Sequence, residues 1–207
     1  MLEIVMLAFL SGAITGGGLI VAVGAQNSFL LEQALKRHYA FPIALLFIAS
    51  DAISIALGAF GLGLLLQSHD WLLSVSRWAG VAFLVWFALG KWRASFQEEH
   101  LILEQYSKRL ALWPLVMMGF AVTWLNPHFY LDTMILMGSL ANQWQDAKWQ
   151  FVFGGVFASI VWFLSLALVG KLCAKWLEKA AFWRWFNRIN AILIWSIALK
   201  IATQPLS

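Results

Sequence analysis

The amino-acid sequence predicts an all-α integral membrane protein with six transmembrane helices, arranged as two inverted three-helix repeats in which helices 1 and 4 are interrupted. Three observations lead to this prediction. Of the 207 residues, 62% are hydrophobic and only 12% are charged, whereas soluble domains are about half apolar and about a quarter charged. The apolar residues form long runs, and two of these runs contain helix breakers. The two sets of breakers lie at corresponding positions in the two halves of the chain.

Six apolar segments are long enough to cross a bilayer, which takes about 20 helical residues. They are residues 4–31, 42–67, 71–90, 110–145, 149–170 and about 182–203. The last segment carries Arg184, Arg188 and Lys200, so a protein with five spans is the alternative. The first segment has no basic region before it, and we interpret it as a span and not as a cleaved signal peptide.

Basic residues indicate the orientation, because cytoplasmic loops carry an excess of Lys and Arg. The loops after spans 1, 3 and 5 hold 11 of the 14 basic residues, and only Arg77, Lys148 and Lys200 belong to the other side. These loops are therefore predicted to be cytoplasmic, with both termini periplasmic. If the sixth segment only lies on the membrane surface, the C-terminus is cytoplasmic instead. The loops also account for the net charge of +4, so no nucleic-acid partner is predicted.

A polar stretch near the middle divides the chain into two halves. We predict a single transmembrane transporter domain over residues 1–207, with repeat one at about 1–92, a cytoplasmic loop at about 93–110 and repeat two at about 111–207. The stretch AVGAQN ends at Asn27 and the stretch AVTWLN ends at Asn126, an offset of 99 residues. Both fall in the first span of a half, and transporters often carry inverted three-helix repeats.

Each of these stretches lies next to residues that break helices. Gly24, with the glycines at 16–18 before it, interrupts the first run, and Pro127 interrupts the fourth. Asn126 is suited to cap a new half-helix that has Pro127 at its first position. The free N–H groups of such a half-helix favour an anion such as a carboxylate. The alternative is an ordinary proline kink that neighbouring helices relieve.

Two carboxylates lie inside the predicted spans, Asp51 near the middle of span 2 and Asp132 beyond the second break. A charge at this depth costs at least about 2.5 kcal/mol, so each is a functional hypothesis by default. Each can bind a cationic substrate, carry a coupling proton, or form a structural ion pair with Arg77 or Lys200. The other acids are predicted at loops or span ends: Glu3, Glu32, Asp70, Glu98, Glu99, Glu104, Asp146 and Glu178.

Polar side chains gather around the two breaks and together resemble the lining of a polar cavity. The candidate substrate-binding residues are Gln26, Asn27, Asp51, Thr123, Asn126, Tyr130 and Asp132, with His128 beside them and Gly24 and Pro127 as the helix breaks. Any single uncharged member can instead be a satisfied hydrogen bond between helices.

The sequence offers no basis for enzymatic chemistry, and we predict that the protein is not an enzyme. It contains no HExxH, GxSxG, P-loop or EF-hand pattern. The single cysteine, Cys173, excludes an internal disulfide or a CxxC redox pair. No clustered set of His, Asp and Cys predicts a metal site, and no cofactor is predicted.

Three segments closely resemble the LysE/ArgO family of basic amino-acid exporters. They are GAQNSFLLEQALKR at 24–37, IASDAISIALGAFGLG at 48–63 and AVTWLNPHFYLDTMILMGSLA at 121–141. The likeness extends over nearly the whole chain and is greatest to the arginine exporter branch of Gram-negative inner membranes, although that branch often has Pro where Ala25 stands here.

The resemblance implies a six-span protein with inverted repeats that exports L-arginine, driven by the proton gradient or the membrane potential. L-Lysine and the toxic analogue canavanine are further candidate substrates. The positions that match the family motifs are Gln26, Asn27, Asp51, Asn126, Pro127 and Asp132.

The leading hypothesis is therefore a secondary transporter of the bacterial inner membrane whose partners are arginine, a coupling proton and the lipid bilayer. The half-helix ends near Asn27 and Asn126 would hold the α-carboxylate, and Asp51 or Asp132 the guanidinium or a proton. The alternative keeps the fold but exports neutral amino acids or a divalent metal. A homo-oligomer is one option that the sequence leaves open.

Overall fold

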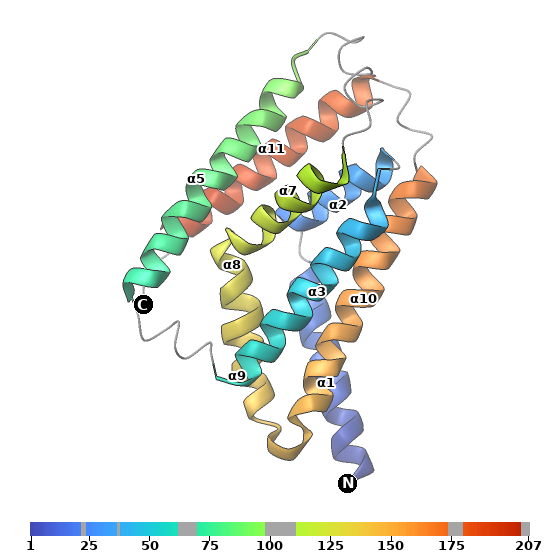
Figure 1. Ribbon diagram of the computed structural model, residues 1–207, viewed down its shortest axis with the longest axis vertical. Coiled ribbons are helices and arrows are strands. Elements are labelled where there is room, and N and C mark those ends of the chain that lie inside the picture. Colours follow the sequence, from blue (N-terminus) through green and yellow to red (C-terminus); the bar gives the residue numbers. More distant parts are fainter. Residues whose placement is uncertain (22–23, 37, 62–69, 98–110, 174–179, 204–207) are drawn as a thin grey trace.

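The computed structural model describes residues 1–207 except 22–23, 37, 62–69, 98–110, 174–179 and 204–207. Within the described residues the regular structure is helical and no strand is present (Figure 1). The longer helices are α1 (Leu2–Val21), α2 (Ala25–Leu35), α3 (Ala40–Ala59), α5 (Asp70–Ala94), α7 (Leu112–Trp124), α10 (Lys148–Leu172) and α11 (Ala180–Thr203). Between α7 and α10 lie the short helix α8 (Pro127–Phe129), the π-helix η1 (Tyr130–Leu136), α9 (Met137–Asn142) and the 3-10 helix η2 (Gln145–Ala147). Most of the predicted polar loop, and the first two residues of AVGAQN, lie outside the described residues.

Three helical segments of the described chain are long and apolar enough to cross a bilayer: Leu2–Val21, Ala40–Ala59 and Gln145–Leu172. Leu112–Trp124 is a shorter apolar helix. Large apolar side chains such as Trp86 and Phe157 are exposed on the surface, and contiguous apolar surface of this kind marks contact with a membrane or a partner. The chain is therefore a multi-pass helical membrane protein, as its composition predicts.

The first and fourth predicted spans are not continuous helices. α1 ends at Val21 and α2 begins at Ala25, whereas α7 ends at Trp124 and α8 begins at Pro127. A proline cannot supply the N–H for a preceding helical turn and clashes with the carbonyl four residues back. The glycine before α2 lowers the cost of leaving the helical conformation. Both interruptions thus lie next to the residues that predict them.

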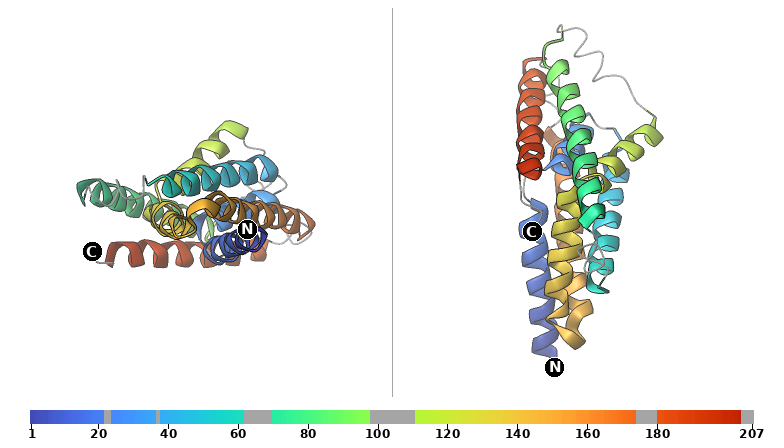
Figure 2. Two further views of the ribbon diagram at one scale, coloured as in Figure 1. Left: turned by 90° about the horizontal axis from the view of Figure 1, so that it is seen from below. Right: turned by 90° about the vertical axis from the view of Figure 1, so that its left-hand side faces the viewer.

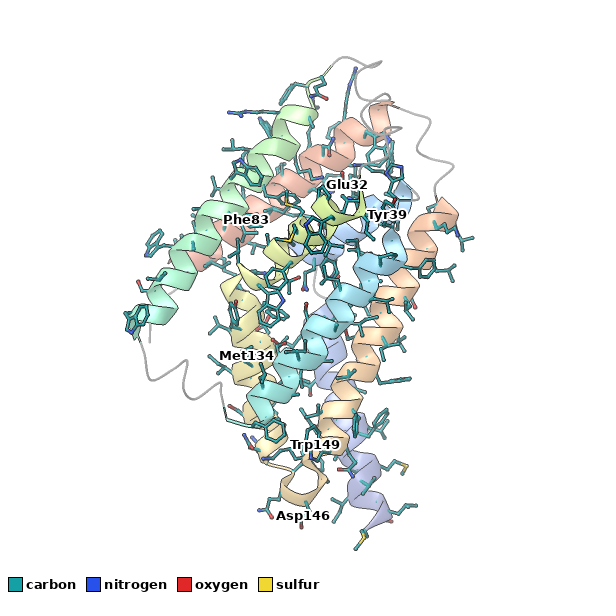
Figure 3. All side chains as sticks on the ribbon, viewed as in Figure 1. Glu32, Tyr39, Phe83, Met134, Asp146 and Trp149 are labelled. Carbon is teal, nitrogen blue, oxygen red and sulfur yellow. The ribbon has the colours of Figure 1, made fainter. Side chains whose placement is uncertain are left out.

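Glycines allow the closest helix crossings. α1 packs along α10, and a Cβ atom built on Gly12 would lie 1.9 Å from the carbonyl oxygen of Phe151. α3 crosses the π-helix equally closely, since a Cβ atom on Gly58 would lie 2.2 Å from the carbonyl oxygen of Met134, which Figure 3 labels. Small residues at such crossings let membrane helices pack backbone to backbone. The two crossings bring α1 against α10 and the π-helix against α3.

The helix α2 lies at the centre of the fold. Eight of its 11 residues are buried, and its Phe29 belongs to an apolar cluster with Phe47 of α3 and Phe163 of α10. α5 and α11 pack along each other and lie beside the remaining helices (Figures 1 and 2). Leu84 of α5 and Ile194 of α11 join the pair to the same cluster.

The two ends of the molecule differ in charge. The N-terminus and the turn that carries Asp146 lie at one end, whereas Glu32 and Tyr39 lie toward the other (Figures 1 and 3). The last turns of α5 and α10 carry basic residues, Lys91 and Arg93 in α5 and Lys171 in α10, and point to this second end. We call it the basic end, defined by Lys36, Lys91, Arg93 and Lys171.

Candidate functional site

The first break is held by the side-chain amide of Asn27. Gly24 has an extended backbone (φ −141°, ψ 178°) and precedes the first residue of α2. The Nδ2 group of Asn27 reaches back and donates to the carbonyl oxygen of Ile20 at 2.9 Å, in the last turn of α1. Trp162 of α10 donates its indole N–H to Oδ1 of Asn27 at 3.1 Å. The amide therefore satisfies a helix-end carbonyl that the break would otherwise leave unpaired.

The second break is capped in the forward direction. The Oδ1 atom of Asn126 accepts a hydrogen bond from the backbone N–H of His128 at 3.1 Å, just inside the helix that begins at Pro127. This is the cap that the sequence predicts for an Asn-Pro pair. The following π-helix, Tyr130–Leu136, is a rare conformation that occurs frequently at functional sites.

A hydrogen bond joins the two breaks across the molecule. The Nε2 group of Gln26, at the start of α2, donates to Oγ1 of Thr123 at 3.0 Å, and Thr123 is the penultimate residue of α7. The Thr123 hydroxyl in turn donates to the carbonyl oxygen of Gly119 at 3.0 Å. The structure thus brings together two predicted site residues that are 97 positions apart in the sequence.

Asp51 lies in the middle of α3 and is only 2% exposed. Its Oδ2 atom accepts a hydrogen bond from the hydroxyl group of Ser159 at 2.7 Å. Ser159 and Trp162 are one turn apart on α10, so the same face of α10 holds both Asp51 and Asn27. Among the described residues, no Lys or Arg side chain pairs with Asp51.

The end of α7 links the second break to the region of Asp51. Trp124 donates its indole N–H to the hydroxyl oxygen of Ser50 at 3.1 Å, and Ser50 is the neighbour of Asp51 in the chain. The hydroxyl group of Tyr130 donates to the carbonyl oxygen of Trp124. Tyr130 therefore satisfies a carbonyl that the end of α7 exposes, as Asn27 does for α1.

Asp132 does not join this cluster. Its side chain is 39% exposed, and its Oδ2 atom lies 3.8 Å from Nδ1 of His128, one turn earlier. Asp132 lies in the π-helix and is more exposed than Asp51. Among the described residues, neither Asp51 nor Asp132 forms an ion pair with Arg77 or Lys200. Arg77 instead donates to the carbonyl oxygen of Ala202 at the end of α11.

Several residues of the site were not predicted. Ser159 and Trp162 lie in an apolar run of α10, and Ser50 and Trp124 flank predicted residues. The sequence places Ser159 one turn before Trp162, but Ser165 lies one turn after it, so the spacing does not single out the two partners. Glu32, predicted at a loop or span end, lies near the end of α2, and its burial (4% exposure) was not predicted.

Comparison with known protein families places this chain in one of them. The LysE type translocator family model matches residues 18–205, which include both breaks and every candidate site residue. The chain belongs to the LysE type translocator family. No solved structure matches the chain.

Three curated relatives from different bacteria are named arginine exporter protein ArgO. The relative from Pectobacterium carotovorum is 38% identical over 195 residues, covering 94% of this chain and 96% of its own. The relative from Serratia proteamaculans is 38% identical over 200 residues, covering 96% and 98%. That from Escherichia coli K12 is 36% identical over 200 residues, covering 96% and 95%.

Proposed function

We propose that this translocator exports L-arginine across the bacterial inner membrane by alternating access. The observation that carries the proposal is Asp51, a fully enclosed carboxylate beside two joined helix breaks, whose side chain accepts a hydrogen bond from Ser159 alone among the described residues. Ionisable groups inside membrane spans mark substrate and ion pathways. The arginine exporters of Pectobacterium, Serratia and Escherichia support the choice of substrate.

Two charged groups of the substrate have candidate partners. The guanidinium group pairs with Asp51, because its planar pair of N–H groups matches a carboxylate bidentately. The α-carboxylate lies at the start of α2, near Gln26 and Asn27, where backbone N–H groups face the break. Discontinuous helices of this kind form the substrate sites of many secondary transporters.

We further propose that Asp132 and His128 carry the coupling proton. Moving a cation outward opposes the membrane potential by about 2.3 kcal/mol per charge per 100 mV, so export of arginine needs a driving ion. Asp132 is more exposed than Asp51, and its Oδ2 atom lies 3.8 Å from Nδ1 of His128. In liposomes, Asp132→Asn should keep arginine exchange but lose its acceleration by a pH gradient.

The topology follows as a proposal: six spans in two inverted repeats, with both termini periplasmic. In such repeats span 1 corresponds to span 4, span 2 to span 5 and span 3 to span 6. The contact of span 1 (α1) with span 5 (α10) then corresponds to a contact of span 4 with span 2, and α3 of span 2 does pack on the π-helix and α9 of span 4. The α5–α11 pair maps onto itself. Reporter fusions at each terminus test this. Termini on opposite sides would show an odd number of spans.

The direct test of export is uptake of radiolabelled arginine by liposomes that contain the purified protein. We expect uptake under a proton gradient or a membrane potential. Asp51→Asn should reduce it severely, because loss of one partner of a buried charged pair costs about 2–5 kcal/mol. Asp146→Asn is the matched control, since Asp146 is an exposed acid in the turn far from the site. An absence of arginine transport under every ion gradient would refute the proposal.

A further inference from the structure

Three charged side chains form a buried cluster at the basic end of α2. The two carboxylate oxygens of Glu32 each pair with a different ammonium group, Oε1 with Lys36 and Oε2 with Lys91. Lys36 follows Glu32 by four residues at the end of the same helix, whereas Lys91 comes from the last turn of α5. Figure 3 shows Glu32 at the end of α2 that is remote from the break. One of the two pairs therefore joins separate helices.

The cluster is shielded from solvent. The exposed fractions of the side chains are 5% for Glu32, 10% for Lys36 and 15% for Lys91. Aromatic rings cover both ammonium groups: Lys91 lies 5.3 Å from the ring centroid of Phe87, and Lys36 lies 5.9 Å from that of Trp183. Separating a buried pair leaves an uncompensated charge in a place of low dielectric constant. The Glu32–Lys91 pair is thus a charged tether between α2 and α5.

The Glu32–Lys91 pair lies near the C-terminal end of α2, whereas the candidate site lies at its N-terminal end. The first turn of α2 carries Gln26 and Asn27, and Ser28 lies one turn before Glu32 on the same helix face. Ser28 is only 8% exposed. Next to Ser28, the ring of Phe29 contacts that of Phe87 of α5, with ring centroids 6.4 Å apart. Parting α5 from α2 therefore loosens the packing beside Ser28.

We propose that Lys91 forms the ion pair with Glu32 that the cationic side chain of the substrate forms during transport. In this conformation the Glu32–Lys91 pair holds α5 against α2. The pair separates when the substrate cation replaces Lys91 at Glu32. This proposal rests on the cation export proposed above and adds a second recognition step, at the opposite end of α2 from the break.

The exchange selects substrates with a positively charged side chain, because such a substrate keeps the charge around Glu32 constant. The cluster has one carboxylate and two ammonium groups, so a guanidinium that replaces Lys91 leaves Glu32 with the same number of positive partners. A guanidinium also offers paired N–H donors that an ammonium lacks. A neutral amino acid brings no side-chain charge and leaves Glu32 with Lys36 alone. The cluster therefore favours cationic substrates independently of Asp51.

Thiol accessibility at Ser28 tests the tether without any substrate. The parent protein carries Ser28→Cys together with Cys173→Ala, because the native cysteine is exposed. We expect Lys91→Gln to raise the rate of reaction with a charged maleimide about tenfold or more, which corresponds to about 1.4 kcal/mol or more of lost closure. Lys36→Gln is the matched control. It removes the same charge from Glu32 but breaks no ion pair between α2 and α5, so the rate should stay near that of the parent.

Rescue separates a lost tether from general damage. The double change Glu32→Lys with Lys91→Glu again places one carboxylate against two ammonium groups, and slow labelling should return. An unchanged labelling rate in Lys91→Gln, in protein that elutes as a single species and unfolds at the parental temperature, would overturn the proposal.

Substrate addition tests the exchange itself. Saturating arginine should accelerate labelling of the parent, and citrulline, its neutral analogue, should not. If Lys91→Gln fails to fold, this comparison decides: equal effects of the two amino acids, or no effect of either, overturn the proposal. Failure of arginine export is read separately, from liposome uptake by the wild-type protein, so the two proposals fall on different measurements.

Discussion

An asparagine side chain stabilises each helix break, but the two asparagines form hydrogen bonds in opposite directions along the chain. Asn27 lies inside α2 and donates backward to the carbonyl of Ile20, the end of the helix before the break. Asn126 lies before α8 and accepts forward from the N–H of His128, the start of the helix after the break. The Asn27 amide caps the C-terminal end of α1 and the Asn126 amide caps the N-terminal end of α8, although the two residues match in the sequence repeat.

The breaks also differ in what holds them. Trp162 of α10 fixes Asn27 from another helix. At the second break the hydroxyl of Tyr130 and the carbonyl of Trp124 bond within the same segment, and a π-helix follows. The first break is thus anchored to α10, whereas the second is anchored to α3 by the hydrogen bond from Trp124 to Ser50.

The largest effect is expected for Asn27→Ala. The change leaves the Ile20 carbonyl and the Trp162 N–H without their partner, and each unsatisfied buried group costs about 1–3 kcal/mol. Thermal unfolding in detergent measures the loss. Trp162→Phe, which removes only the indole donor and leaves the bond from Asn27 to Ile20, should fall between wild type and Asn27→Ala. Equal stability of all three proteins would contradict an anchored first break.

Asn126→Ala should destabilise the protein less. It removes one helix cap, which is worth about 1 kcal/mol. Asn126→Ser keeps a capping oxygen and serves as the control with near wild-type stability. If Asn126→Ala proves more damaging than Asn27→Ala in the same unfolding assay, the ranking of the two breaks is reversed.

The smallest effect is the coupling between the breaks. The bond from Gln26 to Thr123 should give a coupling energy of about 0.5–1.5 kcal/mol. A double-mutant cycle with Gln26→Ala and Thr123→Val isolates this energy from the separate bond of Thr123 to Gly119. Additive single changes would show that the breaks are not joined energetically.

The positions of the breaks could be predicted from the sequence because Gly24 and Pro127 act locally on the backbone. The cap at Asn126 was predictable for the same reason. The 99-residue offset that matches Asn27 with Asn126 did not predict that the two side chains cap different helix ends, since the direction of each bond depends on where the following helix begins. α2 restarts at Ala25, two residues before Asn27, whereas α8 restarts one residue after Asn126.

Long-range partners could not be predicted in this way. Ser159 in an apolar helix has no periodic signature that points to Asp51, 108 positions away. Glu32 lay at the predicted edge of a span, but a lysine 59 positions later makes its burial tolerable. Asp132 lies in a π-helix, a winding that no composition rule predicts, so the exposure of its side chain could not be deduced from its position in the span. These misses share one cause: each depends on another helix or on local winding.

The central claim is that Asp51 recognises the positive charge of the substrate. Competition binding of arginine and citrulline to the purified protein tests it most directly, because the two molecules differ in the charged end group. The wild-type protein should prefer arginine, and Asp51→Asn should lose most of that preference while still folding, with Asp146→Asn as the unaffected control. An Asp51→Asn protein that folds and still prefers arginine to the wild-type extent would contradict the account.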